Sequence, residues 1–232
     1  MSIPRPIVHI GYHKTATTWF QKRLWPGVAS HDFVPRAMAQ RALLDPPGMH
    51  FDPVAASEVL GLAARSKPVI VSEENLSGYI HNGGLHGLMA PEAARRIRQV
   101  LPDARIVIFI RRQADAVRAS YSQYLAAGGT FGLRRYLDTN ARMKGALRSA
   151  FKAPAFEWEH FEYDCLIAHY DELFGRENVF VYPFEELRDA AALLARMERD
   201  LGIAFPEGAA QASASNRSHS RAAVWLLRFA NL

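Results

Sequence analysis

The stretch IVHIGYHKTATTWFQ, residues 7–21, joins a short apolar strand to the start of a helix through a turn that opens at Gly11. The first amide groups of a helix have no backbone partner, and the helix dipole favours negative charge at this end. Lys14 adds a cation directly before the helix. Hydroxyl groups come from Thr15, Thr17 and Thr18. The stretch therefore predicts a site for a phosphorylated ligand, with an ordinary threonine-capped turn as the alternative.

The spacing within this turn differs from the common phosphate-binding loop of ATP- and GTP-binding proteins. That motif is Gly-x-x-x-x-Gly-Lys-Ser/Thr, with a glycine directly before the lysine. Here His13 precedes Lys14, and the lysine follows Gly11 by only three residues. The turn therefore belongs to another class of anion site.

The composition is that of one globular domain. The 232 residues are 49% hydrophobic, enough for one sizeable core, so we expect a single domain over residues 1–232. The formal net charge of +5 suits an anionic ligand. The sequence contains no run of about 18 apolar residues, so no transmembrane segment is predicted. The single cysteine, Cys165, excludes an internal disulfide and suits a reducing compartment; we expect a cytoplasmic protein.

Apolar runs alternate with amphipathic segments along the chain. Buried strands are predicted at 7–10, 69–71, 105–110 and 178–182. Helices are predicted at 16–25, 55–65, 91–101, 114–127, 185–201 and 221–232. The alternation predicts an α/β fold in which helices flank a mostly parallel central sheet in three layers.

Three segments lie outside this regular pattern. Residues 28–54 are expected to be irregular because four prolines interrupt them. Residues 78–87 contain four glycines and predict a mobile loop. Residues 130–165 are rich in aromatic side chains and predict a helical insertion whose aromatics either line a pocket or fill a core.

A second anion site is indicated by IFIRRQADAVRASYSQY, residues 108–124. A strand ends here at two arginines, and an arginine at a strand end is able to bind a phosphate through two parallel hydrogen bonds. Ser120 follows Arg112 by eight residues and adds a hydroxyl if the arginine side chain reaches along the helix. Arg111 exchanges roles with Arg112 if the register shifts. The alternative is a surface ion-pairing arginine and a solvent-facing serine.

The first turn resembles the 5′-phosphosulfate-binding loop of sulfotransferases that use 3′-phosphoadenosine 5′-phosphosulfate (PAPS), typically Lys-Thr/Ser-Gly-Thr-Thr-Trp. The matching positions are Lys14, Thr15, Thr17, Thr18 and Trp19. Ala16 stands where that family usually has glycine. If the backbone there needs a positive φ, the alanine costs roughly 1 kcal/mol.

Two further matches extend the resemblance. Arg112 and Ser120 have the spacing of the family's 3′-phosphate-binding motif, and Phe184 matches an aromatic position near the adenine, with a core phenylalanine as the alternative. The segment 215–224, SNRSHSRAAV, stands where relatives close a loop over the 3′-phosphate, so the resemblance implies a nucleotide contact for Arg217, with a plain turn as the alternative. The resemblance covers most of the chain in pattern and is specific in the two short blocks around Lys14 and Arg112.

The resemblance implies an enzyme that transfers a sulfuryl group from PAPS to a hydroxyl or amine of a small-molecule or glycan acceptor, releasing adenosine 3′,5′-bisphosphate (PAP). Lys14 would stabilise the leaving phosphate, and a glutamate at the end of strand 69–71 would act as general base. Glu73 and Glu74 both remain candidates, with a slight preference for Glu74, and both are alternatively capping or solvent-facing residues. His13 is a second candidate for contacting the sulfuryl group or acceptor.

This chemistry implies neither a metal nor a nucleic-acid partner, and the oligomeric state is not predicted. Two other functions remain open: a nucleotide-dependent small-molecule kinase on a related fold, and a non-catalytic nucleotide-binding module. The kinase has less support because the glycine pattern of the ATP-binding loop and a clear strand-end aspartate for Mg²⁺ are missing from the sequence.

Overall fold

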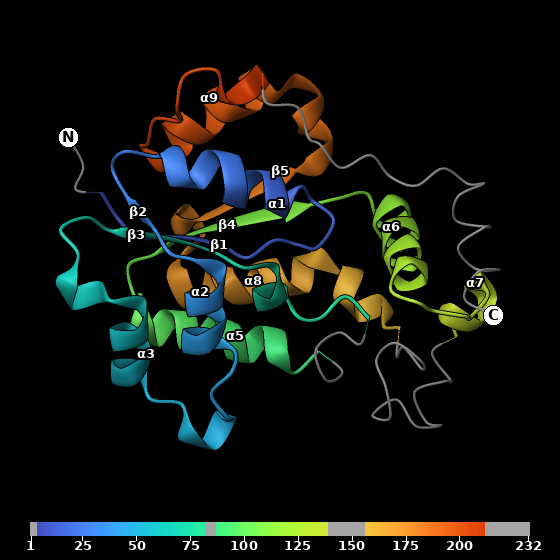
Figure 1. Cartoon of the computed structure of the whole chain (residues 1–232). Helices are drawn as coiled ribbons and strands as arrows, with labels where there is room; N and C mark the ends of the chain where they lie inside the picture. Colours follow the sequence, from blue (N-terminus) through green and yellow to red (C-terminus); the bar gives the residue numbers. More distant parts are fainter. Residues whose placement is uncertain (1–3, 82–86, 139–155, 212–232) are drawn as a thin grey trace.

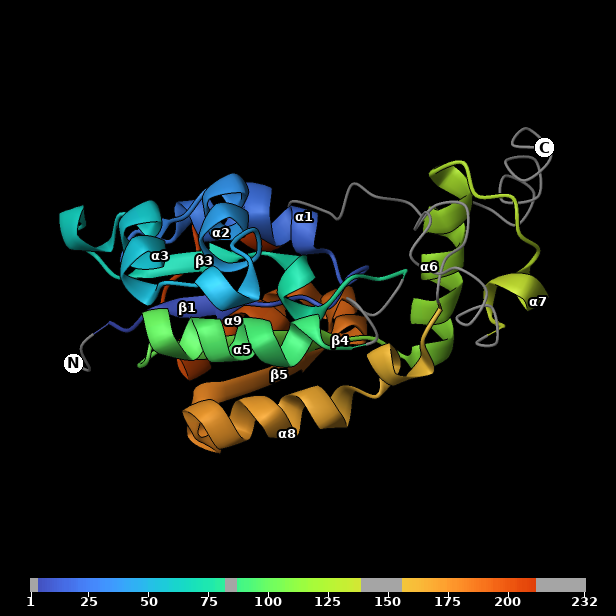
Figure 2. The ribbon, with the colours of Figure 1, turned by 90° about the horizontal axis from the view of Figure 1, so that it is seen from below.

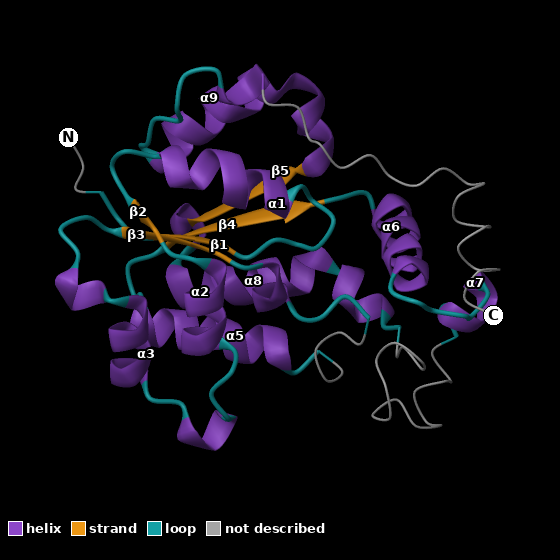
Figure 3. Ribbon diagram, in the orientation of Figure 1, coloured by secondary structure: helices purple, strands orange, loops and turns teal. Residues whose placement is uncertain are grey.

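A five-stranded, all-parallel sheet forms the centre of the protein, in a computed structural model that describes residues 4–81, 87–138 and 156–211. The strands are β1 (Ile7–His9), β2 (Asp32–Phe33), β3 (Val69–Ser72), β4 (Arg105–Ile110) and β5 (Val179–Pro183). Their order across the sheet is β2-β3-β1-β4-β5. Helices cover both faces (Figure 1, Figure 3). The predicted α/β fold with a parallel, three-layer arrangement is confirmed.

The three inner strands are apolar because both of their faces are covered. Every residue of β1 and β3 is buried, as are the four central residues of β4. Val8 of β1 lies between Val71 and Ile106 in the parallel register. Alternate side chains point to opposite faces, so Val8 packs into one core cluster and Ile7 into the other.

One face of the sheet is covered by α1 (Thr17–Trp19), the turns that continue it, and α9 (Ala190–Leu201) (Figure 1). The continuation is a wider π turn at Phe20–Leu24 and a 3₁₀ turn at Trp25–Gly27. Large aromatic side chains fill this layer: Trp19, Phe20, Trp25, Phe109 and Tyr182. The helix predicted at 16–25 is confirmed in extent, although only its first turn is α-helical.

The other face is covered by α2 (Arg36–Leu43), α3 (Pro53–Leu60), α5 (Met89–Val100) and α8 (Tyr163–Phe174) (Figure 2). α5 and α8 pack against each other beneath the sheet. Small residues of α2 and α5, such as Ala39 and Ala94, are completely buried and let these helices approach the strands closely.

The prediction that residues 28–54 are irregular is wrong. They contain β2 and α2, as well as a 3₁₀ turn at Gly48–His50. β2 is only two residues long, which leaves no alternating pattern to detect. Pro35 precedes α2 with φ −56°, and Pro53 is the first residue of α3, where its missing N–H group costs no hydrogen bond. These prolines begin helices instead of interrupting them.

Two other boundaries need correction. α8 continues well beyond residue 165, the expected end of the aromatic insertion, and it packs beneath the sheet. The helix predicted at 185–201 becomes α-helical only at Ala190, because the Asp189 side chain caps it by accepting from the amide of Ala192; the preceding residues, Phe184–Asp189, form 3₁₀ turns.

The helices predicted at 91–101 and 114–127 agree with α5 and with α6 (Gln113–Ala126) within two residues. The helix predicted at 55–65 ends five residues early, at Leu60, because Gly61 takes the left-handed conformation that stops α3. α6 and the short α7 (Leu133–Tyr136) lie beyond the carboxyl edge of the sheet (Figure 1, Figure 2). A separate aromatic core joins them to a 3₁₀ turn at Trp158–Phe161. Further 3₁₀ turns are Leu62–Ala64, Glu74–Ser77, Arg176–Asn178 and Ala209–Gln211. The expected helix at 221–232 and part of the insertion, 139–155, lie outside the described residues.

None of the helices in the described ranges is long and apolar enough to cross a membrane.

Candidate functional site

Four strand ends bring most of the predicted site residues to one edge of the sheet. The loop with Lys14 follows β1, Glu74 follows β3, Arg112 follows β4 and Phe184 follows β5. Carboxyl ends of parallel strands meet at a common edge, which is where ligands bind in open α/β sheets. The fold therefore places residues far apart in sequence around one region.

The loop after β1 has an unusual backbone. Lys14 (φ 63°) and Ala16 (φ 64°) are the non-glycine residues with positive φ in the described chain. Ala16 thus has the conformation that glycine prefers, as the departure from the family pattern suggested. The Thr15 side chain is buried and its hydroxyl donates to the carbonyl oxygen of Tyr12, which ties the loop together.

The remaining loop residues divide between the core and the surface. Thr17 and Trp19 are buried, and Thr18 is exposed. The Trp19 ring contacts Phe20 edge to face, while its Nε1 is buried and has no hydrogen-bond partner among the described residues. Thr18 and the loop backbone therefore present the accessible polar groups of this segment.

Lys14 is an exposed cation beside a second one. The Nη1 atom of Arg111 donates to the carbonyl oxygen of Lys14 at 3.0 Å. Partial burial lowers the pKa of Lys14, and the charge of Arg111 lowers it further, whereas the carboxylate of Glu74 acts in the opposite direction. Positive charge from two strand ends therefore gathers around the loop.

Glu73 and Glu74 have different environments. The Glu73 side chain is completely buried; it accepts from Nε of Arg36 at 2.5 Å, from Gln40 at 2.8 Å and from the Asn75 amide at 2.9 Å. Glu74 accepts from Gln21 at 2.9 Å and pairs with Nη2 of Arg36 at 2.9 Å, and its side chain remains 15% exposed.

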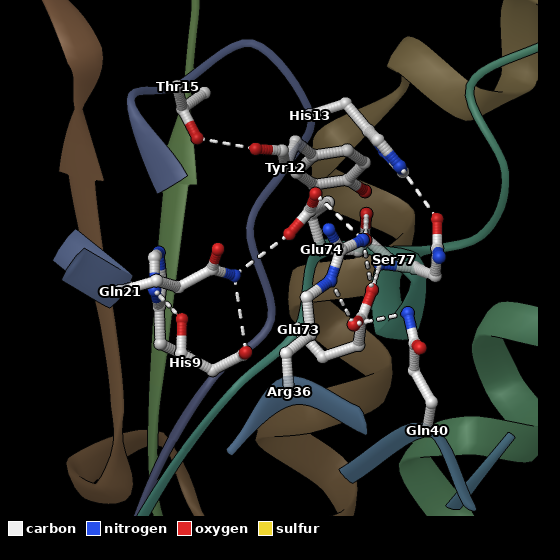
Figure 4. Close-up of polar contacts among 12 residues, drawn as sticks. His9, Tyr12, His13, Thr15, Gln21, Arg36, Gln40, Glu73, Glu74 and Ser77 are labelled. Carbon is white, nitrogen blue, oxygen red and sulfur yellow. Dashed lines mark hydrogen bonds and ion pairs between the residues drawn. The ribbon is translucent and has the colours of Figure 1, made fainter. Parts of the chain in front are cut away.

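Figure 4 shows this division of roles: Glu73 points toward Gln40, whereas Glu74 points toward Gln21 of the first helix. Side chains and backbone of the protein itself surround the Glu73 carboxylate and supply its hydrogen-bond donors. Glu74 is the more accessible of the two carboxylates, and it is the one whose charge acts on Lys14.

His13 belongs to a group of half-buried imidazoles. Its Nε2 donates to Oδ1 of Asn75 at 3.0 Å, while its Nδ1 is buried without a hydrogen-bond partner among the described residues. The ring centroid of His160 lies 6.0 Å from that of His13. Burial lowers the pKa of His13, and it lowers the pKa values of His160 to about 3 and of His81 to about 4. These rings are neutral at pH 7.

A cavity of about 380 Å³ lies at the carboxyl ends of β4 and β5. Its lining is formed by Arg111, Arg112, Asp115, Phe184, Glu185, Leu187 and Arg188. The guanidinium carbon of Arg111 lies 4.6 Å from the centre of the Phe184 ring, and Arg112 keeps 65% of its side chain exposed. An aromatic face beside several guanidinium groups suits a nucleotide base and its phosphates.

Two predicted nucleotide contacts do not appear in this cavity. Ser120 is buried within α6 and its hydroxyl donates to the carbonyl oxygen of Ala116 at 2.9 Å. Its pairing with Arg112 around a phosphate therefore stays a prediction. Arg217 lies outside the described residues.

A second, smaller cavity of about 190 Å³ opens between the first turns of α5 and α8. Tyr12 of the Lys14 loop and His160 line it, and the His160 ring contacts both Tyr12 and His13. Ser77 also lines it and donates to the carbonyl oxygen of Glu74. The smaller cavity therefore lies next to the turn that carries Glu74.

Several residues that surround Glu73 and Glu74 were not identified from the sequence. Arg36 and Gln40 belong to α2, in the segment that was expected to be irregular, and Gln21 was taken only as a helix residue. The i, i+4 spacing of Arg36 and Gln40 was the one signal available, because it puts both side chains on the same helix face. The described residues contain no group of three or more His, Cys, Asp or Glu side chains that could hold a metal ion.

The arrangement of the sheet and its helices is that of the sulfotransferase fold, as comparison with solved structures shows. A sulfotransferase from Alicyclobacillus acidocaldarius superposes with a TM-score of 0.61 at 20% sequence identity, over 100% of this chain and 93% of the other. The sulfotransferase domain of the curacin biosynthetic pathway superposes with a TM-score of 0.52 at 11% identity, over 93% of this chain and 80% of that one. No protein-family model and no curated protein sequence matches the chain. At these identities the similarity establishes the fold alone.

Proposed function

We propose that this protein is a PAPS-dependent sulfotransferase that transfers a sulfuryl group to a hydroxyl or amine of a small-molecule or glycan acceptor. The observation that carries the proposal is the meeting of Lys14 and Glu74 at one edge of a sulfotransferase fold, beside a cavity lined by Arg111, Arg112 and Phe184.

The available groups fit a nucleotide with phosphates at both ends. Lys14, the exposed Thr18 hydroxyl and the loop amides would hold the 5′ end. Arg112 would bind the 3′-phosphate, and the ring of Phe184 would stack on the base. The buried Nε of Arg111 has no hydrogen-bond partner among the described residues, which is consistent with a missing anionic partner.

We assign one residue to each role that the transfer requires. Glu74 would take the proton of the acceptor hydroxyl as that oxygen bonds to sulfur, and the bond between sulfur and the leaving phosphate oxygen breaks. Lys14 would stabilise the charge that develops on that phosphate, in the same way that cations stabilise phosphoryl transfer. His13, through its free Nδ1, would accept a hydrogen bond from the acceptor.

The proposal is tested by sulfate transfer from labelled PAPS to a panel of phenol, sugar and amine acceptors. Lys14→Ala and Glu74→Gln should each lower the rate by about a hundredfold or more, because each removes a group that acts in the transition state. Lys22→Ala removes an exposed lysine of the first helix, and is the matched control; it should keep wild-type activity. Glu74→Gln should still bind PAP, which distinguishes lost chemistry from lost binding.

The other two functions predict different results in calorimetry and in the same assay. A kinase should bind ATP tightly in a Mg²⁺-dependent manner, and this result would contradict the sulfotransferase proposal. A non-catalytic module should bind PAP with no transfer to any acceptor, whether or not Glu74 is present.

A further inference from the structure

The guanidinium of Arg112 already has carboxylate partners. Its Nε lies 3.2 Å from Oδ2 of Asp115 and 3.5 Å from Oε1 of Glu185. The backbone amide of Arg112 donates to the same Glu185 oxygen at 3.1 Å. One carboxylate oxygen thus accepts from the main-chain amide and forms an ion pair with the side chain of the residue that the proposed function assigns to the 3′-phosphate.

This pairing contributes little to the stability of the fold. The Arg112 side chain is 65% exposed, and ion pairs between exposed groups are worth little. The adjacent carboxylate, Glu186, has a different role. It accepts from Arg196 at 2.9 Å, and Arg196 also donates to the carbonyl oxygen of Val181. This pair therefore connects α9 to β5. Glu186 does not line the cavity, whereas Glu185 does.

The charged side chains that line the cavity at the ends of β4 and β5 nearly balance one another. Its cationic lining consists of Arg111, Arg112 and Arg188, and its anionic lining consists of Asp115 and Glu185. A phosphate that binds Arg112 through Nε and the backbone amide meets the Glu185 carboxylate at the same two donors. Like charges a few ångströms apart repel each other even when solvent screens them.

We propose that Glu185 is a specificity-determining residue for the nucleotide: its carboxylate competes with the 3′-phosphate for Arg112 and has to be displaced when the phosphate binds. The inference rests on the proposed function. Glu185 consequently lowers the affinity for nucleotides that carry a 3′-phosphate and leaves the affinity for other nucleotides unchanged. The difference between the two affinities becomes smaller.

Calorimetric titration of wild type, Glu185→Gln and Glu186→Gln with PAP and with adenosine 5′-monophosphate tests this inference. The glutamine at position 185 keeps an oxygen that accepts from the Arg112 amide but removes the charge. PAP should bind Glu185→Gln about tenfold more tightly than wild type, as expected for removing one charge near a surface phosphate. The affinity for the monophosphate should stay unchanged.

Glu186→Gln is the matched control, because it removes the neighbouring charge outside the cavity, and it should leave both affinities unchanged. Thermal unfolding without nucleotide checks that each variant is folded. Equal changes for both nucleotides in Glu185→Gln, or weaker binding of PAP, would overturn the inference while leaving the proposed function intact. If folded wild type bound neither nucleotide, the proposed function and the inference would both be wrong.

Discussion

Gly11 and Glu74 touch at the carboxyl edge of the sheet: a Cβ atom added to Gly11 would lie 3.2 Å from both Cα and Cβ of Glu74. Gly11 also has φ +94°, a conformation that side chains rarely adopt. The loop that carries Lys14 and the turn that carries Glu74 therefore approach as closely as they do because residue 11 has no side chain.

Replacing Gly11 by alanine should impair both stability and sulfuryl transfer. The positive φ alone costs about 1–2 kcal/mol, and the new methyl group pushes against the backbone of Glu74. We expect activity to fall by about tenfold or more because a small displacement of Glu74, the proposed base, is costly. Gly128→Ala is the control, since Gly128 has φ +91° and nothing within 4 Å of its added Cβ. Equal losses of activity in the two variants would contradict the role of this contact.

Ala16→Gly should stabilise the protein. Ala16 has φ 64°, where glycine avoids the steric penalty of a left-handed backbone but loses more chain entropy on folding, so the net gain should be about 0.5–1 kcal/mol. Chemical denaturation measures the change. Ala192→Gly, at an exposed position of α9, should instead destabilise by about 0.5–1 kcal/mol. A loss of stability at both positions would mean that the left-handed conformation of Ala16 carries no strain.

Glu73 should matter for stability far more than for chemistry. Its buried carboxylate binds Arg36, Gln40 and the backbone of Asn75, so Glu73→Ala should destabilise by about 2 kcal/mol because these three donors lose their acceptor. The loss is moderated at Arg36, whose side chain is 43% exposed and is able to bond to water instead. Urea unfolding should show a much smaller effect for Glu74→Gln, whose side chain is partly exposed. A stable Glu73→Ala variant that loses only its activity would instead assign the base to Glu73.

Binding of PAP should weaken at alkaline pH, and Lys14 should account for the change. Burial and the charge of Arg111 lower the pKa of Lys14, so this side chain loses its positive charge at a lower pH than an ordinary lysine. An anionic ligand then binds less tightly as the pH rises through that pKa. Lys14→Arg keeps its charge over this range and should bind PAP with a flatter profile between pH 7 and 10. Parallel profiles for the two proteins would assign the change to another group.

Low pH should destabilise the fold because a buried histidine, His9, becomes protonated more readily in the unfolded state than in the folded state. Burial lowers the pKa of His9 to about 3 from its ordinary 6.5, so the folded state takes up fewer protons than the unfolded state. Stability is therefore complete above pH 6.5 and is lost as the pH falls from there toward 3. His9 alone should cost about 2 kcal/mol between pH 7 and pH 5. His9→Asn should unfold in urea with a shallower pH dependence over this interval; an unchanged slope would contradict the assignment.

The strands that could be predicted are the three inner strands, which are buried on both faces, and the apolar edge strand β5. Their continuous apolar runs, such as the one at Arg105–Ile110, are visible locally in the sequence. β2 could not be predicted, because its two residues carry no pattern and gain their partners only by pairing with β3. α2 was missed because Pro35 carries the same sequence signal whether it begins a helix or interrupts one.

The sequence by itself determined the position and the chemical groups of the loop that we propose as the anion site, because Gly11, Lys14 and the threonines are close neighbours within a single turn. Tertiary structure alone distinguished Glu73 from Glu74. Both follow the same strand and both pair with Arg36, which is more than 30 residues away in sequence. The difference arises because Gln40 and the Asn75 amide complete the enclosure of Glu73, whereas Glu74 stays partly exposed. Burial depends on which distant groups pack around a side chain, and no local pattern contains that information.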